Sequence, residues 1–227
     1  MTRNLLAFFV VLLLVPFGML ACTQQNIFSS SIVSLQNLAK ADMEQGRYSD
    51  AQTKLQQEIA ANPTNYIAVS LLAACYAAQG NIILYQILVV KVFSLNADPN
   101  TNPIGFAKLL LPTPTATVLT QNALANSTMD LIPVLNKTSD MQFQHYMFAS
   151  VYLFLQIIDA VNILQGGGVV APAQLTQILN SLNYANSLSN GSGNFIVSAL
   201  SALTNGIQNS PGATQEDKLA NYLLLFV

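Results

Sequence analysis

Side chains that could carry out acid–base chemistry are few and widely spaced in this sequence. His145 is the only histidine, and Asp159 follows it by 14 residues. On a helix that spacing brings the two near one face but separates them by about four turns, so they cannot form a catalytic dyad directly. Glu216 and Asp217 are adjacent, and adjacent residues of a helix point to different sides. We therefore predict that the chain is not an enzyme, and we expect His145 to be a surface or helix-capping residue.

The sequence does not indicate a metal or phosphate site either. No pair of histidines or cysteines has the spacing of zinc ligands. The run Gly166-Gly167-Gly168 lacks the following lysine and the preceding strand of a phosphate-binding loop, so we expect a turn there. Neither a cofactor nor a metal is predicted.

One of the two cysteines stands in a pattern that points to lipid attachment. Residues 1–21 contain Arg3, an apolar run from Leu5 to Val15, and helix breakers before Cys22, as an export signal does. A small residue followed by Cys22 resembles the bacterial lipoprotein box. The resemblance implies that Cys22 becomes the mature N-terminus and carries acyl chains on its sulfur and its amine, which hold a protein stably at a membrane when two or more are present. An ordinary cleaved signal and an uncleaved anchor are the alternatives, although the apolar run is shorter than the roughly 20 residues of a spanning helix.

The residues after the lipoprotein box bear on location. Thr23 is not the aspartate that retains such proteins at the inner membrane of enteric bacteria, so the resemblance implies the outer membrane, facing the periplasm. Residues 22–31 would be a short polar tether. The second cysteine, Cys75, lies among small apolar residues with no basic neighbour, so we expect a buried small hydrophobic residue and no reactive thiol.

The stretch from Leu35 to Gly80 has an internal repeat. Its period is 34 residues, shared by the pairs Gly46 and Gly80, Leu38 and Leu72, and Ala39 and Ala73. The period and residue types resemble the tetratricopeptide repeat family over about one and a half repeats. The resemblance implies an all-α fold of antiparallel helix pairs in a right-handed array over residues 32–99, with additional C-terminal helices.

Local signals agree with helix pairs. Ala39 and Ala51 are small where two helices must approach closely, and Leu35, Leu38 and Leu55 could fill the space around that contact. Gly46 stands where the first helix must end with a positive φ, and Gly80 holds the matching place. Asp42 departs from the family pattern, which usually has an aromatic residue there.

The region 100–227 reads as further helices without a clean 34-residue period, either degenerate repeats or a helical cap. We expect a joint at Pro112 and Pro114, a capping cluster at Thr138, and no strand. The expected helices are 81–95, 104–111, 116–125, 129–136, 141–164, 173–188, 194–208 and one from Thr214. The long helix 141–164 should have one apolar face. The apolar C-terminus is expected to dock on the core, the alternative being an offer to a partner.

The amino-acid composition limits the kinds of partner that the chain can bind. The chain is 52% hydrophobic and 8% charged, whereas a charged share of about 25% is usual. This favours either the neutral polar surface of an exported protein or a surface covered by a partner or a membrane. A net charge of −2 gives no electrostatic case for binding nucleic acid, which needs a basic patch.

In the tetratricopeptide family the first helix of each repeat lines a concave groove, and this position predicts a partner-binding site. Its residues would be Gln36, Lys40, Met43, Glu44, Ser70, Ala74, Ala77 and Ala78. The second set, rich in alanine, could take a packed helix of another protein or of this chain. We therefore predict a lipid-anchored periplasmic adaptor that binds a protein of a secretion, pilus or outer-membrane assembly complex. The alternative is a periplasmic lipoprotein that carries a small hydrophobic ligand or assists solute uptake, with a cavity lined by the helix 141–164.

Overall fold

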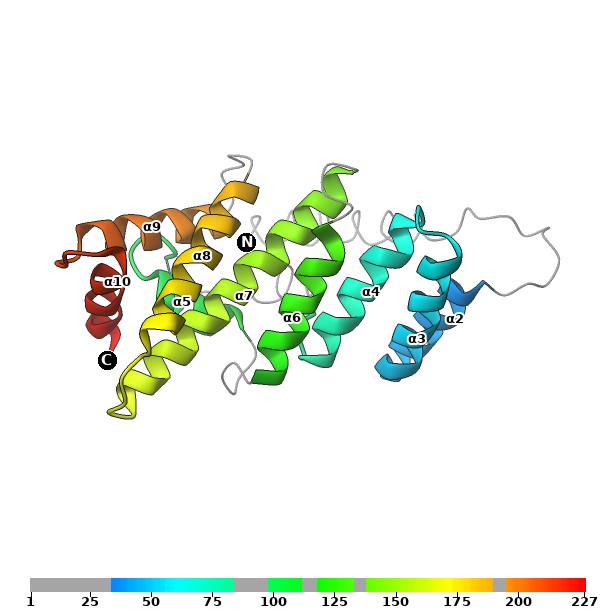
Figure 1. Ribbon diagram of the computed structural model, residues 1–227, viewed down its shortest axis with the longest axis horizontal. Coiled ribbons are helices and arrows are strands. Elements are labelled where there is room, and N and C mark those ends of the chain that lie inside the picture. Colours follow the sequence, from blue (N-terminus) through cyan, green and yellow to red (C-terminus); the bar gives the residue numbers. More distant parts are fainter. Residues whose placement is uncertain (1–33, 84–97, 112–117, 133–137, 190–194) are drawn as a thin grey trace, which may run out of the picture. The chain divides into compact units, whose positions relative to one another are not determined.

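The computed structural model describes residues 34–83, 98–111, 118–132, 138–189 and 195–227. Within these ranges every regular element is a helix (Figure 1), which confirms the all-α prediction. The elements are α2 (Leu35–Glu44), α3 (Tyr48–Ala61), α4 (Tyr66–Gln79), α5 (Pro103–Leu110), α6 (Val118–Leu131), α7 (Ser139–Gln165), α8 (Pro172–Leu188), α9 (Phe195–Asn209), α10 (Gln215–Leu223) and a short 3₁₀ turn, η4 (Leu224–Phe226). The chain separates into residues 1–34 and 35–227, and the fold described here is that of the second unit.

Helices α2 and α3 form the expected hairpin. Ala39 and Ala51 are both fully buried in their contact, together with Leu55. Gly46 has the predicted positive φ of 72°, and its N–H donates to the Met43 carbonyl (3.0 Å), as at a glycine-capped helix end. Leu38, expected to fill the contact, is instead 39% exposed, because Ala39 takes the buried position of that turn.

Asp42, at the position where the repeat family has an aromatic residue, is buried between two cations. Its carboxylate forms ion pairs with Lys54 and with Arg47. The Arg47 Nε atom donates to Asp42 Oδ1 at 3.0 Å. Hydrogen bonds from Lys54, first, and from Arg47 lower the pKa of this carboxyl. A charge cluster between α2 and α3 therefore replaces ring packing.

The end of α4 differs from the repeat prediction by one residue. Gly80 has an ordinary φ of −82°, and the positive φ of 59° belongs to Asn81. The Ile82 N–H donates to the Ala77 carbonyl and the Asn81 N–H to the Ala78 carbonyl, both at 2.9 Å, so Asn81 is the left-handed residue that follows the C-cap of α4. Gly80 serves a close approach instead, since a Cβ there would lie 3.1 Å from the Cα of Thr120 on α6.

Helix α4 follows the α2–α3 hairpin along the chain, and it packs against α6. The Ser127 hydroxyl of α6 donates to the Ala73 carbonyl of α4. Two short helices were expected over 116–125 and 129–136, which is wrong for the described part: α6 is continuous to Leu131. The Thr128 hydroxyl accommodates this by donating to the Leu124 carbonyl (2.9 Å) within the helix. The helix predicted over 81–95 and the joint at Pro112 and Pro114 fall largely or wholly outside the described residues.

Helix α7 is the centre of the main core. Thr138 caps it as predicted, accepting from the Met141 N–H at 3.1 Å. The apolar face of α7 is wider than its spacing indicated, because α7 is contacted by α5, α6, α8 and α10 and is buried around most of its circumference. Asp159 and Asn162, expected on its polar remainder, are only half-buried. Within the described residues α7 is the one helix whose length and apolar character would suit a membrane span. However, 72% of its most apolar 18-residue stretch is buried inside the fold. That burial is what a core helix shows.

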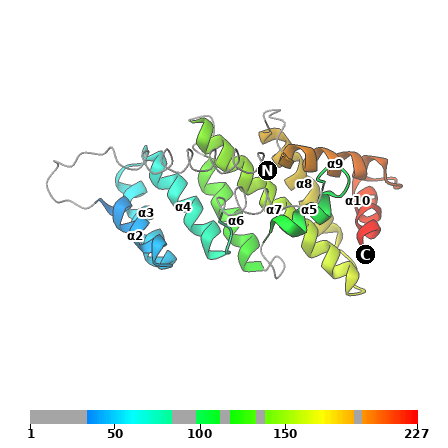
Figure 2. The ribbon, with the colours of Figure 1, turned by 180° about the vertical axis from the view of Figure 1, so that it is seen from behind.

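Helix α5 lies on α7 and α9 (Figure 2). Its Phe106 ring contacts Phe154 of α7 at a centroid distance of 6.4 Å and Phe195 of α9 at 5.8 Å. Helix α10 starts at a capping box formed by Thr214 and Asp217. The chain beyond it docks only in part.

The C-terminal prediction is therefore half right. Tyr222 and Leu223 are buried in the main core, and Phe226 packs against it. Leu224, Leu225 and Val227 are exposed, because the 3₁₀ turn places them on its outer side.

The buried residues form two clusters. The small core consists of Ala39, Ala51, Leu55, Ala68, Leu72 and Cys75, from α2, α3 and α4. The main core runs from α4 to α10 around α7. Helix α4 contributes to both, since Val69, Ala73 and Ala77 belong to the main core. The tetratricopeptide arrangement of these helices stays a prediction.

Candidate functional site

The first-repeat groove residues lie partly open on α2. Lys40 and Glu44 are exposed, whereas Met43 is half-buried against the small core. Gln36 is also half-buried, and its Oε1 accepts a hydrogen bond of 3.4 Å from Asn65 Nδ2. Lys40 and Glu44 are the residues of this set that a partner could reach freely.

The second-repeat groove residues are largely taken up by the chain itself. Ser70 is bonded to Gln144 of α7, whose Nε2 donates to the Ser70 carbonyl at 3.2 Å. Ala77 is fully buried in the main core, and Ala74 and Ala78 are half-buried. Cys22, the predicted lipidation site, lies outside the described residues.

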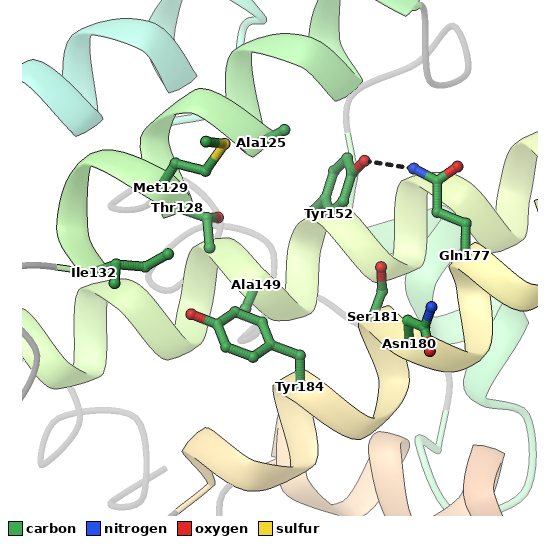
Figure 3. A pocket seen from close by; sticks show the side chains of 10 residues that line it. All are labelled: Ala125, Thr128, Met129, Ile132, Ala149, Tyr152, Gln177, Asn180, Ser181 and Tyr184. Atoms are coloured by element: carbon green, nitrogen blue, oxygen red, sulfur yellow. Dashed lines mark hydrogen bonds between the residues drawn. The ribbon is translucent and has the colours of Figure 1, made fainter.

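A surface pocket opens elsewhere, between α6, α7 and α8 (Figure 3). Its volume is about 340 Å³. The lining residues are Ala125, Thr128 and Met129 from α6, Ile132 directly after α6, Ala149 and Tyr152 from α7, and Gln177, Asn180, Ser181 and Tyr184 from α8. None of these side chains is charged. Helix α8 contains no charged residue at all, so the pocket is an apolar hollow with a neutral polar rim.

Small residues create the hollow and large ones enclose it. Ala149 of α7 and Ala125 of α6 leave space where longer side chains would fill the seam between the helices (Figure 3). Met129 and Ile132 stand on the α6 side and are 64% and 49% exposed. Two large apolar side chains are therefore displayed to solvent next to an open apolar hollow, which marks a binding surface.

Hydrogen bonds hold the two tyrosines of the pocket. The Tyr152 hydroxyl accepts from Gln177 Nε2 at 3.0 Å. The Tyr184 hydroxyl lies 2.8 Å from Nε2 of His145, and the two rings meet edge to face with centroids 5.7 Å apart. Both hydroxyls thus have partners that fix the rings.

His145 is the clearest correction to the sequence prediction. It was expected at the surface or at a helix end, but it is fully buried in α7. Burial lowers its pKa, and its Nδ1 atom has no hydrogen-bond partner. Asp159, as expected, forms no dyad with it and instead accepts a hydrogen bond from Gln174 of α8 at 3.0 Å.

Two other titratable groups among the described residues are Cys75 and Asp130. Cys75 is a buried free thiol, and burial raises its pKa to about 11, as expected for a small hydrophobic residue. Asp130 of α6 has a buried Oδ2 atom without a partner, and burial raises its pKa to about 6. Among the residues that the structure describes, no group of three or more His, Cys, Asp or Glu side chains could hold a metal ion.

No family model matches the chain, and no similar protein is found among curated proteins or solved structures. The ligand-carrier alternative expected a cavity lined by the helix 141–164, but sequence reasoning missed the share of α6 and α8, because the lining residues lie up to 59 positions apart along the chain, from Ala125 to Tyr184. The available signal was the presence of Ala125 and Ala149 together with Tyr152 and Tyr184 on three helices. It can be used only when it is known which helices are neighbours.

Proposed function

We propose that this chain is a lipid-anchored helical adaptor that binds a protein component of an envelope complex at the pocket between α6, α7 and α8. The observation that carries the proposal is the open, uncharged hollow beside the exposed Met129 and Ile132. Cores of protein interfaces are depleted of charge and enriched in methionine and aromatic residues. The lipoprotein-like Cys22 would place the adaptor at the outer membrane, facing the periplasm.

Binding without catalysis agrees with the state of the reactive groups. Cys75 is buried, and His145 and Asp159 are each bonded to a residue of α8. The exposed Lys40 and Glu44 of α2 would supply a second, polar contact to the partner. The second-repeat positions contribute less to this proposal, because Ser70 and Ala77 contact the chain's own helices.

A photoreactive amino acid at Met129 in intact cells tests the site. We expect it to cross-link one envelope protein, and we expect the cross-link to disappear when Ala125→Phe fills the pocket. The matched control is Asn126→Phe, which adds the same ring to the neighbouring, exposed position of α6 outside the pocket lining. A cross-link that survives Ala125→Phe as well as it survives Asn126→Phe would remove the pocket from the proposed function.

A second candidate function is the carriage of a small hydrophobic ligand. A volume of about 340 Å³ lies within the range of about 300–1,000 Å³ that small-molecule pockets occupy, and Ala149 and Tyr152 of α7 line it. Native mass spectrometry of the protein released from lipid nanodiscs tests this. A bound small molecule that is retained by Asn126→Phe and lost in Ala125→Phe supports the carrier; a bare protein in all three samples rejects it.

A further inference from the structure

We infer that the pocket between α6, α7 and α8 selects an aromatic side chain of the partner protein. The inference rests on the proposed function and names the chemistry of the group that enters. The pocket offers two tyrosine rings, Tyr152 from α7 and Tyr184 from α8, and the thioether of Met129 from α6 (Figure 3). Aromatic rings pack edge to face with other rings, and thioether sulfur makes favourable contacts at ring edges.

The rings are positioned before anything binds. Tyr184 is held through its hydroxyl by the buried His145, and Tyr152 by Gln177. Both rings line the hollow and both hydroxyls are already bonded, so a partner group would meet mainly the carbon atoms of the rings. A site whose walls are fixed in this way loses little side-chain freedom when a partner group enters.

The surroundings exclude charged groups. None of the ten lining residues is charged, so a lysine or glutamate side chain would be desolvated there without a counter-charge, which is unfavourable. Ala125 and Ala149 line the hollow with short side chains, which leave room for a flat group between the helices. A neutral ring therefore fits both the shape and the chemistry better than a branched aliphatic chain.

The absence of tryptophan from the chain allows a direct measurement. The full-length protein in lipid nanodiscs is titrated with N-acetyl-tryptophanamide, whose indole fluorescence then has no background from the protein. We expect a blue shift on binding that is retained by Asn126→Phe and lost in Ala125→Phe. A blue shift that persists in Ala125→Phe would place the indole outside the pocket and overturn the inference.

Competition then tests selectivity. N-acetyl-phenylalaninamide should displace the indole probe about two- to tenfold better than N-acetyl-leucinamide, the advantage that ring contacts give beyond buried area. Tyr184→Leu should bring this ratio towards one, whereas Tyr184→Phe, which loses the same hydroxyl but keeps the ring, should preserve it. Equal displacement by the two competitors in the unaltered protein would contradict the selection of aromatic groups.

The outcomes separate this inference from the function on which it rests. If Ala125→Phe abolishes the Met129 cross-link but leucine and phenylalanine compete equally, the adaptor stands and the aromatic selectivity is wrong. If the indole binds selectively but the cross-link is unaffected by Ala125→Phe, the pocket takes aromatic groups and the adaptor site is wrong.

Discussion

His145 of α7 and Tyr184 of α8 are joined in the core, with the imidazole Nε2 atom 2.8 Å from the tyrosine hydroxyl. The contact is one of three cross-helix hydrogen bonds from positions seven residues apart on α7. Tyr152 bonds to Gln177 and Asp159 bonds to Gln174, both at 3.0 Å. A spacing of seven places residues on one face of a helix, so a polar seam joins α7 to α8 beside the pocket.

The buried end of this seam should matter more for stability than its exposed part. We expect Tyr184→Phe to lower the free energy of unfolding by about 1–3 kcal/mol, because it leaves both nitrogens of the buried His145 without a partner. Tyr152→Phe removes a hydrogen bond at the surface and should change it by less than about 1 kcal/mol. Urea unfolding of both variants measures the difference. Equal losses would show that burial of His145 adds nothing to its hydrogen bond.

The stability should fall in mild acid because of His145. Its pKa is lowered by burial in the folded protein, so the unfolded chain takes up a proton first as the pH falls below about 6.5. The contribution is therefore fully present above that pH and is lost below it. Asp140 and Asp159 are the carboxylates of α7, and α8 has none, so no acid on α8 offsets the charge. His145→Gln should lose this part of the pH dependence in urea unfolding between pH 7.5 and 5; an unchanged profile would assign the acid sensitivity to another group.

Asp130 should act in the opposite direction. Burial raises its pKa from 3.8 to about 6, so the folded protein favours the protonated acid; the resulting loss of stability begins as the pH rises past 3.8 and is complete above about 6. We expect Asp130→Asn to raise the free energy of unfolding by about 1–3 kcal/mol at pH 7.5 and to give no advantage at pH 4. Asp140→Asn, at an exposed position of α7, is the control and should not stabilise. A gain for Asp130→Asn that is equal at both pH values would show that the removed charge is not its cause.

The positive φ of Asn81 after α4 can be tested by substitution. Because Asn81 has a φ of 59°, Asn81→Gly should stabilise the protein by about 0.5–1 kcal/mol, and Asn81→Ala should destabilise it by about 1 kcal/mol. Gly80→Ala should also destabilise, for a different reason, since its Cβ would press on the Thr120 backbone. Thermal unfolding of the three variants measures the order. Stabilisation by Gly80→Ala would mean that α6 can move away at little cost.

The proposed tether depends on Cys22. We expect Cys22→Ser to move the protein from the membrane fraction to the soluble fraction, because the acyl chains attach through this sulfur. Metabolic labelling with a clickable fatty acid measures the lipid attachment itself. The label should be absent from Cys22→Ser and present in Cys75→Ser. Membrane association that persists without label would point to an uncleaved anchor.

Local features of the fold were readable from the sequence because each depends on a few adjacent residues. Gly46 marked a helix end through its need for positive φ, Thr138 marked a helix start, and Ala39 and Ala51 marked a close helix contact. All of these hold in the structure. The 34-residue period was less reliable, since it pointed to Gly80 as the positive-φ residue after α4, whereas that residue is Asn81.

Features that depend on which helix packs on which were not readable. Helix α7 is buried almost all round and its buried positions include polar residues such as His145 and Gln156, so its sequence pattern could not show that His145 faces α8 or that four helices pack against it. The pocket depends on Ala125 of α6 and Ala149 of α7 lining the same hollow, which no local pattern encodes. The predicted groove residues illustrate the same limit: Ser70 is bonded to Gln144, 74 positions away.

The two cores share one helix, and this has a mechanical consequence. Helix α4 gives Leu72 and Cys75 to the small core and Ala73 and Ala77 to the main core. A pull along the N-terminal segment, such as a membrane attachment would transmit, enters the fold at α2. It would load the small core, together with the contact of Ile59 of α3 on the main core, before reaching α4. The α2–α3 hairpin is thus expected to unfold first under tension, before the helices that form the pocket are loaded.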